Sequence, residues 1–314
     1  MTEAIHSQSS MARAEHFQHN LQPPAGILNV FSRLSYKPEY AIAEFVDNST
    51  QSYLLHQEEL EVLVDNFIMR VHIEYSPSDK TLIIKDNAYG MNRERFLDAI
   101  TLDAKNNHQT NSRNEFGMGL KTAASWFGNI WTVESTELGA NEKYSATVNI
   151  PYLNDSGENN VDIDILKARP EEHGTIIVIQ ELTKGMGGRS IEKIKSMLAS
   201  MYRRDLATKK IEIYYNDKPI LFEPYPILTY QGDSWKKDLD FSFNFNEKNF
   251  RVTGFAAIME PGGHSKAGFA LFRRNRVVYG GEGRNYKPSE IFGQSGSQVG
   301  LKLFGELNLD DFPV

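Results

Sequence analysis

The most informative segment of this chain is Glu44-Phe45-Val46-Asp47-Asn48. It lies in a run of apolar residues that recur at helical spacing, which predicts a helix over roughly residues 39–55. Residues four apart on a helix project from the same face, so Glu44 and Asn48 point into the same space. A carboxylate and an amide there can work together, although a solvated helix face also explains this pair when it is taken alone.

Three further clusters follow along the chain. Asp86-Asn87-Ala88-Tyr89-Gly90-Met91 leaves the second strand of a β-hairpin that is predicted over 67–75 and 81–85. Phe116-Gly117-Met118-Gly119-Leu120-Lys121 places glycines before a helix. Gly174-Thr175 opens a later strand. Each of these clusters also has a purely structural explanation, as a turn, a glycine turn or the start of a strand.

The second and third clusters have side chains and backbone suited to a nucleotide. A buried carboxylate at Asp86 can accept a hydrogen bond from an exocyclic amine, which distinguishes adenine from guanine by donor against acceptor. The backbone N–H groups and the positive end of the helix after Gly117 can meet phosphate oxygens. Lys121 adds a positive charge at the same place.

In this order the four clusters resemble the Bergerat-type ATP site of the GHKL superfamily, whose members include gyrase B subunits, MutL, heat-shock chaperones and sensor kinases. The resemblance covers about residues 25–185. The matching boxes are E-x-x-x-N at Glu44 to Asn48, D-x-G-x-G at Asp86 to Gly90, G-x-G-L-K at Gly117 to Lys121, and the final G-T at Gly174-Thr175.

This sequence departs from the family pattern at two positions. Ala88 replaces the first glycine of the second box, which is tolerable if its φ is negative. Gln51 stands where gyrase-like members carry an aspartate, which removes an extra acidic contact but not the base or the metal ligand. Within the superfamily, the segments 43–49 and 268–276 are most similar to MORC-type ATPases, particularly bacterial members.

The resemblance implies a role for each matching residue. Glu44 would be the catalytic base that orients water toward the γ-phosphate, and Asn48 would bind the Mg²⁺ that bridges the phosphates. Asp86 would accept from the adenine amine directly, and Thr175 through a water molecule. The other ATP-binding residues implied, with Lys105 reaching in from a lid, are Ala88, Gly90, Met91, Lys105, Phe116, Gly117, Met118, Gly119, Leu120 and Lys121.

The pattern of elements predicts an α+β chain with helices on one face of a mixed sheet. The resemblance implies a two-layer α/β sandwich followed by a smaller α/β transducer domain. We expect a flexible N-terminal arm over 1–24, an ATP-binding domain over 25–187 and a transducer-like domain over 188–314. Three glycines between residues 185 and 188 favour this boundary. In relatives a transducer lysine reaches the γ-phosphate, and we expect that lysine to lie beyond Val314, with the transducer truncated at its C-terminus.

Composition excludes several classes of protein. With 314 residues, 40% hydrophobic and 24% charged, the chain is globular. A net charge of −7 argues against a nucleic-acid clamp made by the whole chain. The absence of cysteine excludes disulfides and thiolate chemistry, and the absence of a Gly-Lys dipeptide excludes a Walker-A loop. With neither a signal peptide nor an apolar span, we expect a soluble, cytoplasmic protein without a membrane partner.

These observations lead to an ATPase switch as the first hypothesis. ATP would close a lid between Asn92 and Asn114, the arm would cross to a second subunit, and two ATPase heads would form a homodimer until slow hydrolysis. Contact with DNA would come from regions outside this segment. The alternatives are a nucleotide-binding interaction or sensor module without hydrolysis, and an ATPase like the heat-shock chaperones or MutL. A sensor kinase would need a helix with a phosphoacceptor histidine before Glu44, and none is predicted.

Overall fold

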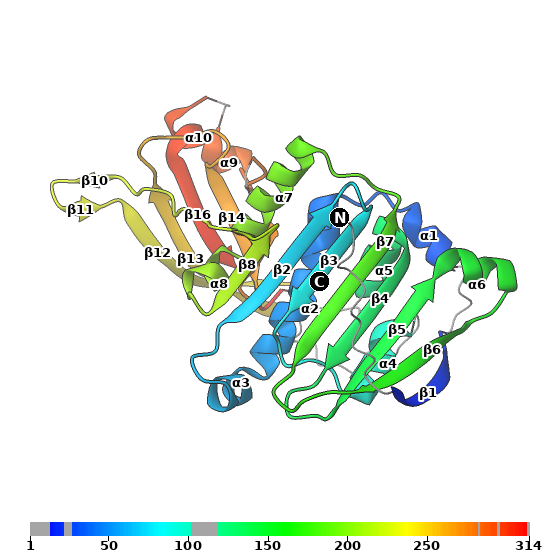
Figure 1. Cartoon of the computed structure of the whole chain (residues 1–314). Coiled ribbons are helices and arrows are strands. Elements are labelled where there is room, and N and C mark those ends of the chain that lie inside the picture. Colours follow the sequence, from blue (N-terminus) through cyan, green and yellow to red (C-terminus); the bar gives the residue numbers. More distant parts are fainter. Residues whose placement is uncertain (1–12, 22–26, 102–118, 282, 294–295, 313–314) are drawn as a thin grey trace, which may run out of the picture. The chain divides into compact units, whose positions relative to one another are not determined.

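The computed structural model of the chain describes residues 13–21, 27–101, 119–281, 283–293 and 296–312 (Figure 1). These residues divide into two compact units. The first contains the described residues up to Gly188 together with the segment Glu212–Pro219, and the second contains the others. The chain therefore leaves the first unit after Gly188 and returns to it for one short segment. The transducer assignment of residues 188–314 stays a prediction.

The first unit is built on one large sheet. Within the described residues this sheet has nine strands in the order β1-β6-β5-β4-β7-β3-β2-β8-β9. The pairs from β1 through to β2 are antiparallel, as is β8 with β9. The strands are β1 (Arg13–Asn20), β2 (Met69–Ser76), β3 (Thr81–Asp86), β4 (Gly128–Thr136), β5 (Glu142–Asn149), β6 (Asn160–Lys167), β7 (Gly174–Leu182), β8 (Ile211–Tyr215) and β9 (Lys218–Pro219).

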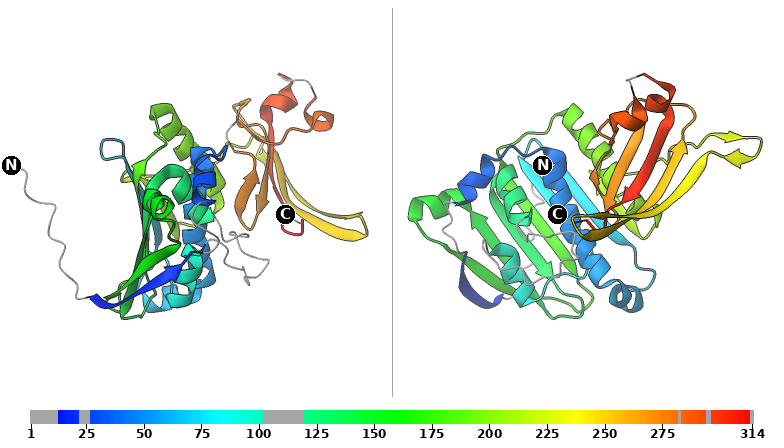
Figure 2. Two further views of the ribbon diagram at one scale, coloured as in Figure 1. Left: turned by 90° about the vertical axis from the view of Figure 1, so that its right-hand side faces the viewer. Right: turned by 180° about the vertical axis from the view of Figure 1, so that it is seen from behind.

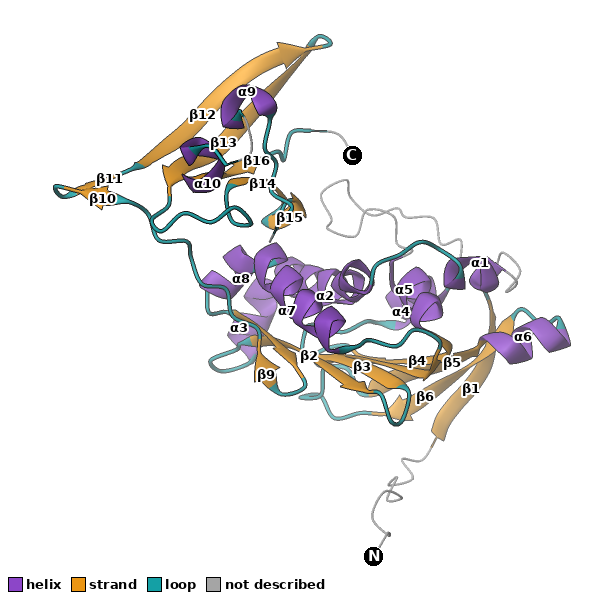
Figure 3. Cartoon of the chain, turned by 90° about the horizontal axis from the view of Figure 1, so that it is seen from above, coloured by secondary structure: helices purple, strands orange, loops and turns teal. Residues whose placement is uncertain are grey.

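Helices α2, α4 and α5 cover one face of this sheet, as the edge-on view in Figure 2 and the view from above in Figure 3 show. The prediction of an α+β fold with a helical layer on a sheet is confirmed. The helices of this unit are α1 (Leu28–Ser32), α2 (Pro38–Leu55), α3 (Gln57–Leu63), α4 (Arg93–Ile100), α5 (Gly119–Phe127) and α6 (Ile150–Ser156). Among the described helices, none has both the length and the apolar composition needed to cross a lipid bilayer.

Helix α2 is the central element of the helical layer. Pro38 occupies its first turn, where a fixed φ and a missing N–H cost nothing. The apolar side chains that predicted the helix are fully buried: Ala41, Ile42, Phe45 and Val46. Because burying each large apolar side chain stabilises the fold by roughly 1.5–3 kcal/mol, this face fixes the rotation of α2 on the sheet. The predicted helix is therefore confirmed, together with the β2–β3 hairpin that follows it.

Part of the predicted flexible arm is a strand. Residues Arg13–Asn20 form β1, which pairs with the edge of β6. The ring of Phe17 lies 4.6 Å from the Arg93 guanidinium, and Leu21 is only 1% exposed. Backbone pairing to an available sheet edge therefore outweighs the polar composition of this segment, which is what predicted an arm. The rest of the predicted arm, 1–12 and 22–24, lies outside the described residues.

The second unit contains a five-stranded sheet, counted over the described residues, in the order β12-β13-β16-β14-β15. Strand β14 runs parallel to β16, and the other pairs are antiparallel. The elements are α7 (Gly188–Met201), α8 (Arg203–Ala207), β10 (Thr229–Tyr230), β11 (Asp233–Ser234), β12 (Lys236–Phe245), β13 (Lys248–Ile258), β14 (Gly268–Arg273), β15 (Arg276–Tyr279), α9 (Ser289–Phe292), α10 (Gln298–Lys302) and β16 (Leu303–Asn308).

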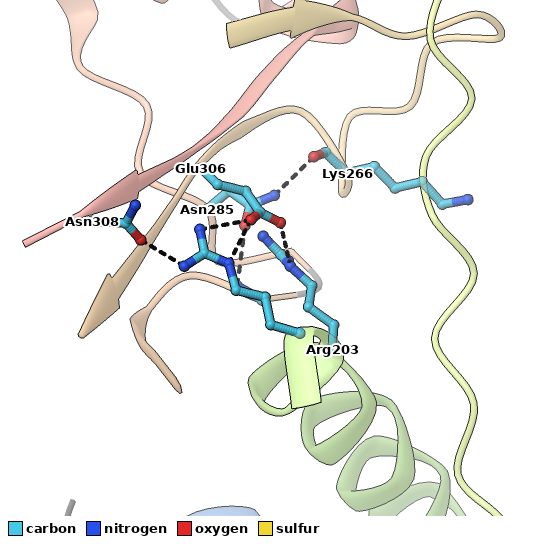
Figure 4. A network of polar contacts seen from close by, with 7 residues as sticks. Arg203, Lys266, Asn285, Glu306 and Asn308 are labelled. Atoms are coloured by element: carbon cyan, nitrogen blue, oxygen red, sulfur yellow. Dashed lines mark hydrogen bonds and ion pairs between the residues drawn. The ribbon is translucent and has the colours of Figure 1, made fainter. Parts of the chain in front are cut away.

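A charged network ties α8 to strand β16 within this unit (Figure 4). The Glu306 carboxylate accepts from Arg203 Nε at 2.7 Å and from Arg204 Nε at 2.9 Å. Arg204 also donates to Asn308 Oδ1 at 2.5 Å, and its guanidinium lies 3.5 Å from the centroid of the Phe272 ring. Because Arg203 is only 6% exposed, these bonds compensate the burial of its charge. The network is structural and fixes the position of α8.

Candidate nucleotide-binding site

The predicted base and metal ligand lie on a helix that is otherwise buried. Of residues 41–50, all of which the structure describes, only Glu44 and Asn48 keep partial exposure. They are four residues apart on α2 and therefore share one face. Polar side chains on a core helix need partners or a ligand, because burying an unsatisfied polar group is costly. This face of α2 is thus the side on which a ligand can be bound.

The Glu44 carboxylate lies between Tyr36, which precedes α2, and Gly119 of the glycine cluster. Tyr36 Oη donates a hydrogen bond to Glu44 Oε1 at 2.9 Å. On the other side, a Cβ added at Gly119 would overlap Glu44 Oε2 and lie 3.1 Å from Cδ. A side chain at position 119 would therefore displace the Glu44 carboxylate from this position. The first and third sequence clusters meet at this carboxylate.

Asp86 ends strand β3 and is almost fully buried, with 8% exposure. Its Oδ2 accepts from Ser49 Oγ at 2.7 Å, and its Oδ1 accepts from the backbone N–H groups of Ala88 at 3.0 Å and Thr175 at 3.1 Å. Burial raises the pKa of Asp86 above its ordinary value, and these hydrogen bonds oppose the shift. Asp86 therefore connects the fourth cluster, through Thr175, to α2, through Ser49, which follows Asn48 directly.

Ser135 on β4 connects the turn after Asp86 to the start of β7. Its hydroxyl donates to Gly174 O at 3.1 Å and accepts from Met91 N at 3.0 Å. It also lies 3.0 Å from Thr175 Oγ1. Gly90, with φ +81°, packs so tightly that a Cβ would overlap Thr136 O. The glycine in the second box is therefore required by the approach of β4.

The departure at Ala88 causes no backbone strain. The residue is 1% exposed and does not have a positive φ, so the condition stated for an alanine at this position is met. The His173 ring fixes the carbonyl of Ala88 through a 2.8 Å hydrogen bond at Nδ1. Alanine therefore replaces the family glycine here without a conformational cost.

Comparison with known protein families agrees with this geometry. Residues 36–188 match the family model described as histidine kinase-, DNA gyrase B-, and HSP90-like ATPase. This match supports the resemblance of these residues to the ATPase domains of the GHKL superfamily. The matched range contains all four clusters and coincides closely with the first unit up to Gly188. No curated protein matches the chain.

The backbone geometry at Gly174, the glycine of the last box, predicts that this position tolerates little change. Gly174 has φ +111°, and a Cβ there would overlap Asp86 O. We expect Gly174→Ala to lower the free energy of unfolding by about 2 kcal/mol or more. Two costs combine here, the strain of a positive φ in alanine and the overlap of its Cβ with a backbone oxygen. Urea unfolding measures this. Gly139→Ala is the matched control, since Gly139 has φ +81° but no atom within 4 Å of an added Cβ. Equal losses for both variants would contradict the overlap argument.

Lys121, predicted to bind phosphate, makes a different contact in the structure. Its ammonium group donates to Asp98 O at 3.0 Å and to Thr101 O, both at the C-terminal end of α4. The side chain is 1% exposed, and burial lowers the pKa of Lys121 to about 8. A cation at these last carbonyls stabilises the negative end of α4. Its phosphate role stays a prediction.

Lys121 also leads to a pH-dependent prediction. Its folded pKa of about 8 lies below its ordinary value of 10.5, so the unfolded chain binds the extra proton between these pH values. The free energy of unfolding should therefore rise with pH across this window, by up to ~1.4 kcal/mol per pH unit. Lys121→Met should lose this rise. Urea unfolding of both proteins from pH 7.5 to pH 10 measures it, and parallel curves would contradict the assignment.

Of the other predicted site residues, some lie within the described part of the chain and some lie outside it. Met91 keeps partial exposure, whereas Leu120 is 7% exposed and packs in the core. The ATP-binding roles of both residues stay predictions. The remaining predicted contacts lie outside the described residues: Lys105, Phe116, Gly117 and Met118.

Asn48 is the candidate ligand for a metal ion. Among the described residues, no group of three or more histidine or carboxylate side chains could hold a metal ion. Asn48 offers an amide oxygen, a hard ligand of the type that Mg²⁺ prefers, on the same face as Glu44. Because Mg²⁺ commonly binds through one or two protein oxygens plus phosphates and water, this donor set fits Mg-ATP.

A cavity of about 350 Å³ lies at the ends of β3, β4 and β7 and touches Asp86 and Thr175. Its lining also includes Lys85, Glu134 and Lys143. Successive side chains on a strand point to opposite faces, so Lys85 lies on the opposite side of the sheet from Asp86. We therefore do not assign the adenine to this cavity.

Sequence reasoning did not single out four residues that support the site: Tyr36, Ser49, Ser135 and His173. Ser49 could have been recognised from the sequence, because it follows Asn48 on a predicted helix and lies in the segment most similar to MORC-type ATPases. The other three reach the site from separate elements, and their sequence neighbourhoods contain no motif.

Proposed function

We propose that the GHKL-type domain binds Mg-ATP and hydrolyses it slowly. The observation that supports this most is the arrangement of α2. This one helix places Glu44 and Asn48 on a partly exposed face, while Ser49 from the next position bonds to the buried Asp86 carboxylate. The proposed catalytic base and metal ligand therefore lie on one helix, which also bonds to the acid proposed to read the adenine. Such fixed positions favour phosphoryl transfer to water.

The chemistry follows from this placement. Glu44 would accept a proton from a water molecule as its oxygen attacks the γ-phosphorus, and the bond to the ADP oxygen would break. Asn48 would hold the metal, which supplies charge stabilisation to the phosphates when bound. No covalent intermediate on the protein is needed, because positioning and electrostatic stabilisation account for most of the catalysis in such transfers.

The nucleobase would be read by Asp86. Its carboxylate accepts hydrogen bonds, so it matches the exocyclic amine of adenine and repels the carbonyl oxygen that guanine carries at the same position. Thr175, whose backbone N–H already bonds to Asp86, would contribute its hydroxyl through a water molecule. We therefore propose that the site binds ATP more tightly than GTP.

We further propose that the domain acts as a MORC-like switch. Two heads would form a homodimer on binding Mg-ATP and separate after hydrolysis, and any action on DNA would involve other regions of the protein. This step is supported by the resemblance of segments 43–49 and 268–276 to bacterial MORC-type ATPases. Light scattering with ATP, a non-hydrolysable analogue and ADP tests it. Equal mass in all three states would rule out the dimer switch.

Calorimetry with ATP and GTP, combined with a phosphate-release assay, tests the main proposal. We expect ATP to bind about 10- to 100-fold more tightly than GTP, since a mismatched buried polar group costs roughly 1–3 kcal/mol. Phosphate release should depend on Mg²⁺. Binding without release would favour a nucleotide sensor, and a failure to bind either nucleotide would overturn the proposal.

A further inference from the structure

We propose that Tyr36 is a positioning residue for Glu44, and that it selects Oε2 as the atom that accepts the proton from water. This inference rests on the proposed hydrolysis at the same site. It goes beyond that proposal because it assigns a role to a residue outside the four sequence clusters and separates the two oxygens of the base.

The hydroxyl of Tyr36 is well fixed. It donates to Glu44 Oε1 at 2.9 Å, while its ring stands edge-on against the Trp126 ring, with centroids 6.0 Å apart and planes at 89°. Trp126 is 5% exposed, and its Nε1 donates to Leu34 O at 3.0 Å. The tyrosine is thus held by α5 and by the turn that leads into α2. A donor fixed in this way restricts the rotation of the carboxylate.

The second oxygen of Glu44 lies on the opposite side, against Gly119. Because Gly119 has no Cβ, Oε2 can occupy space that any other residue would fill. Gly119 begins α5, and the backbone N–H groups at the start of a helix are where phosphate oxygens bind. With Oε1 engaged by Tyr36, Oε2 is the oxygen directed to the side where a γ-phosphate and its water would lie.

A phenol suits this task chemically. It donates one hydrogen bond and is uncharged near pH 7, so it orients the carboxylate without forming an ion pair. A lysine or arginine at the same place would also orient Glu44, but a neighbouring positive charge would make it a poorer base. Positioning of this kind affects the rate strongly, since displacement of a reacting group by about 1 Å can cost about 100-fold.

The test is Tyr36→Phe, which keeps the ring against Trp126 and removes the donor. We expect kcat to fall about 10- to 100-fold, with KM and the calorimetric Kd for ATP changed less than about 2-fold. In a Glu44→Gln background the same change should have no further effect, because the two residues act as a unit.

The chain offers a matched control. Tyr53 lies on α2 and donates to Glu61 Oε1 at 3.0 Å, the same type of bond at the same eight-residue separation. Tyr53→Phe should leave kcat unchanged. If Tyr36→Phe lowers kcat no more than Tyr53→Phe while Glu44→Gln is inactive, the inference fails and the proposed function stands. If Tyr36→Phe raises the Kd for ATP by the same factor by which it lowers kcat, the residue shapes the nucleotide site and the inference also fails. A wild-type protein that does not hydrolyse ATP would overturn both.

Discussion

Glu44→Gln is expected to bind ATP with nearly wild-type affinity and to hydrolyse it about 10²- to 10⁴-fold more slowly. The glutamine side chain has the same shape, and its carbonyl oxygen can still accept from Tyr36 Oη. Its amide nitrogen then lies beside Gly119, in the place of Oε2, the carboxylate oxygen that would accept the proton. The variant therefore retains the geometry of the site and loses only the base. Single-turnover phosphate release and calorimetry measure the two effects separately.

Glu61→Gln is the appropriate control for this variant. Glu61 also accepts from a tyrosine of the same helical layer, and we assign it no part in the chemistry. Its substitution should leave both Kd and kcat unchanged. Undiminished turnover in Glu44→Gln would mean that another group accepts the proton and that the base is misplaced.

Local patterns were sufficient to predict much of the fold and of the site. The 3.6-residue period of the apolar side chains predicts α2, and it places Glu44 and Asn48 on one face because they are four residues apart. The hairpin signals predict β2 and β3, so the position of Asp86 at a strand end also follows from the sequence. These features depend only on neighbours within a few residues, which is the range over which sequence periodicity carries information.

Contacts between distant segments could not be predicted in this way. The bond from Thr175 N to Asp86 spans 89 residues, and the contact of Ser135 with Thr175 requires β4 to lie beside β7. Similarly, β8 and β9 follow the predicted domain boundary in sequence but belong to the first sheet. Such pairings are decided by which sheet edge is available, and no local pattern records that.

Asp86→Asn is expected to weaken binding of ATP and ADP by about 10- to 100-fold while leaving the fold intact. The asparagine oxygen can keep the bonds from Ala88 N and Thr175 N, and its amide can donate to Ser49 Oγ, because a hydroxyl both donates and accepts. The folded state therefore retains its partners. The adenine amine, however, would face an N–H donor, and the unpaired groups cost roughly 1–3 kcal/mol. Calorimetry and thermal unfolding measure the two effects.

The same reversal of donor and acceptor predicts a change of specificity. Inosine triphosphate carries a carbonyl oxygen where ATP carries the amine, so the asparagine amide of Asp86→Asn can donate to it and the preference for ATP should shrink at least about tenfold. Asp79→Asn, a substitution at an exposed turn whose carboxylate accepts from Ser76 Oγ, should change neither affinity nor preference. A folded Asp86→Asn protein with wild-type affinity for ATP would mean that the purine is recognised elsewhere. An unchanged ratio of the two affinities would limit Asp86 to supporting the turn after β3.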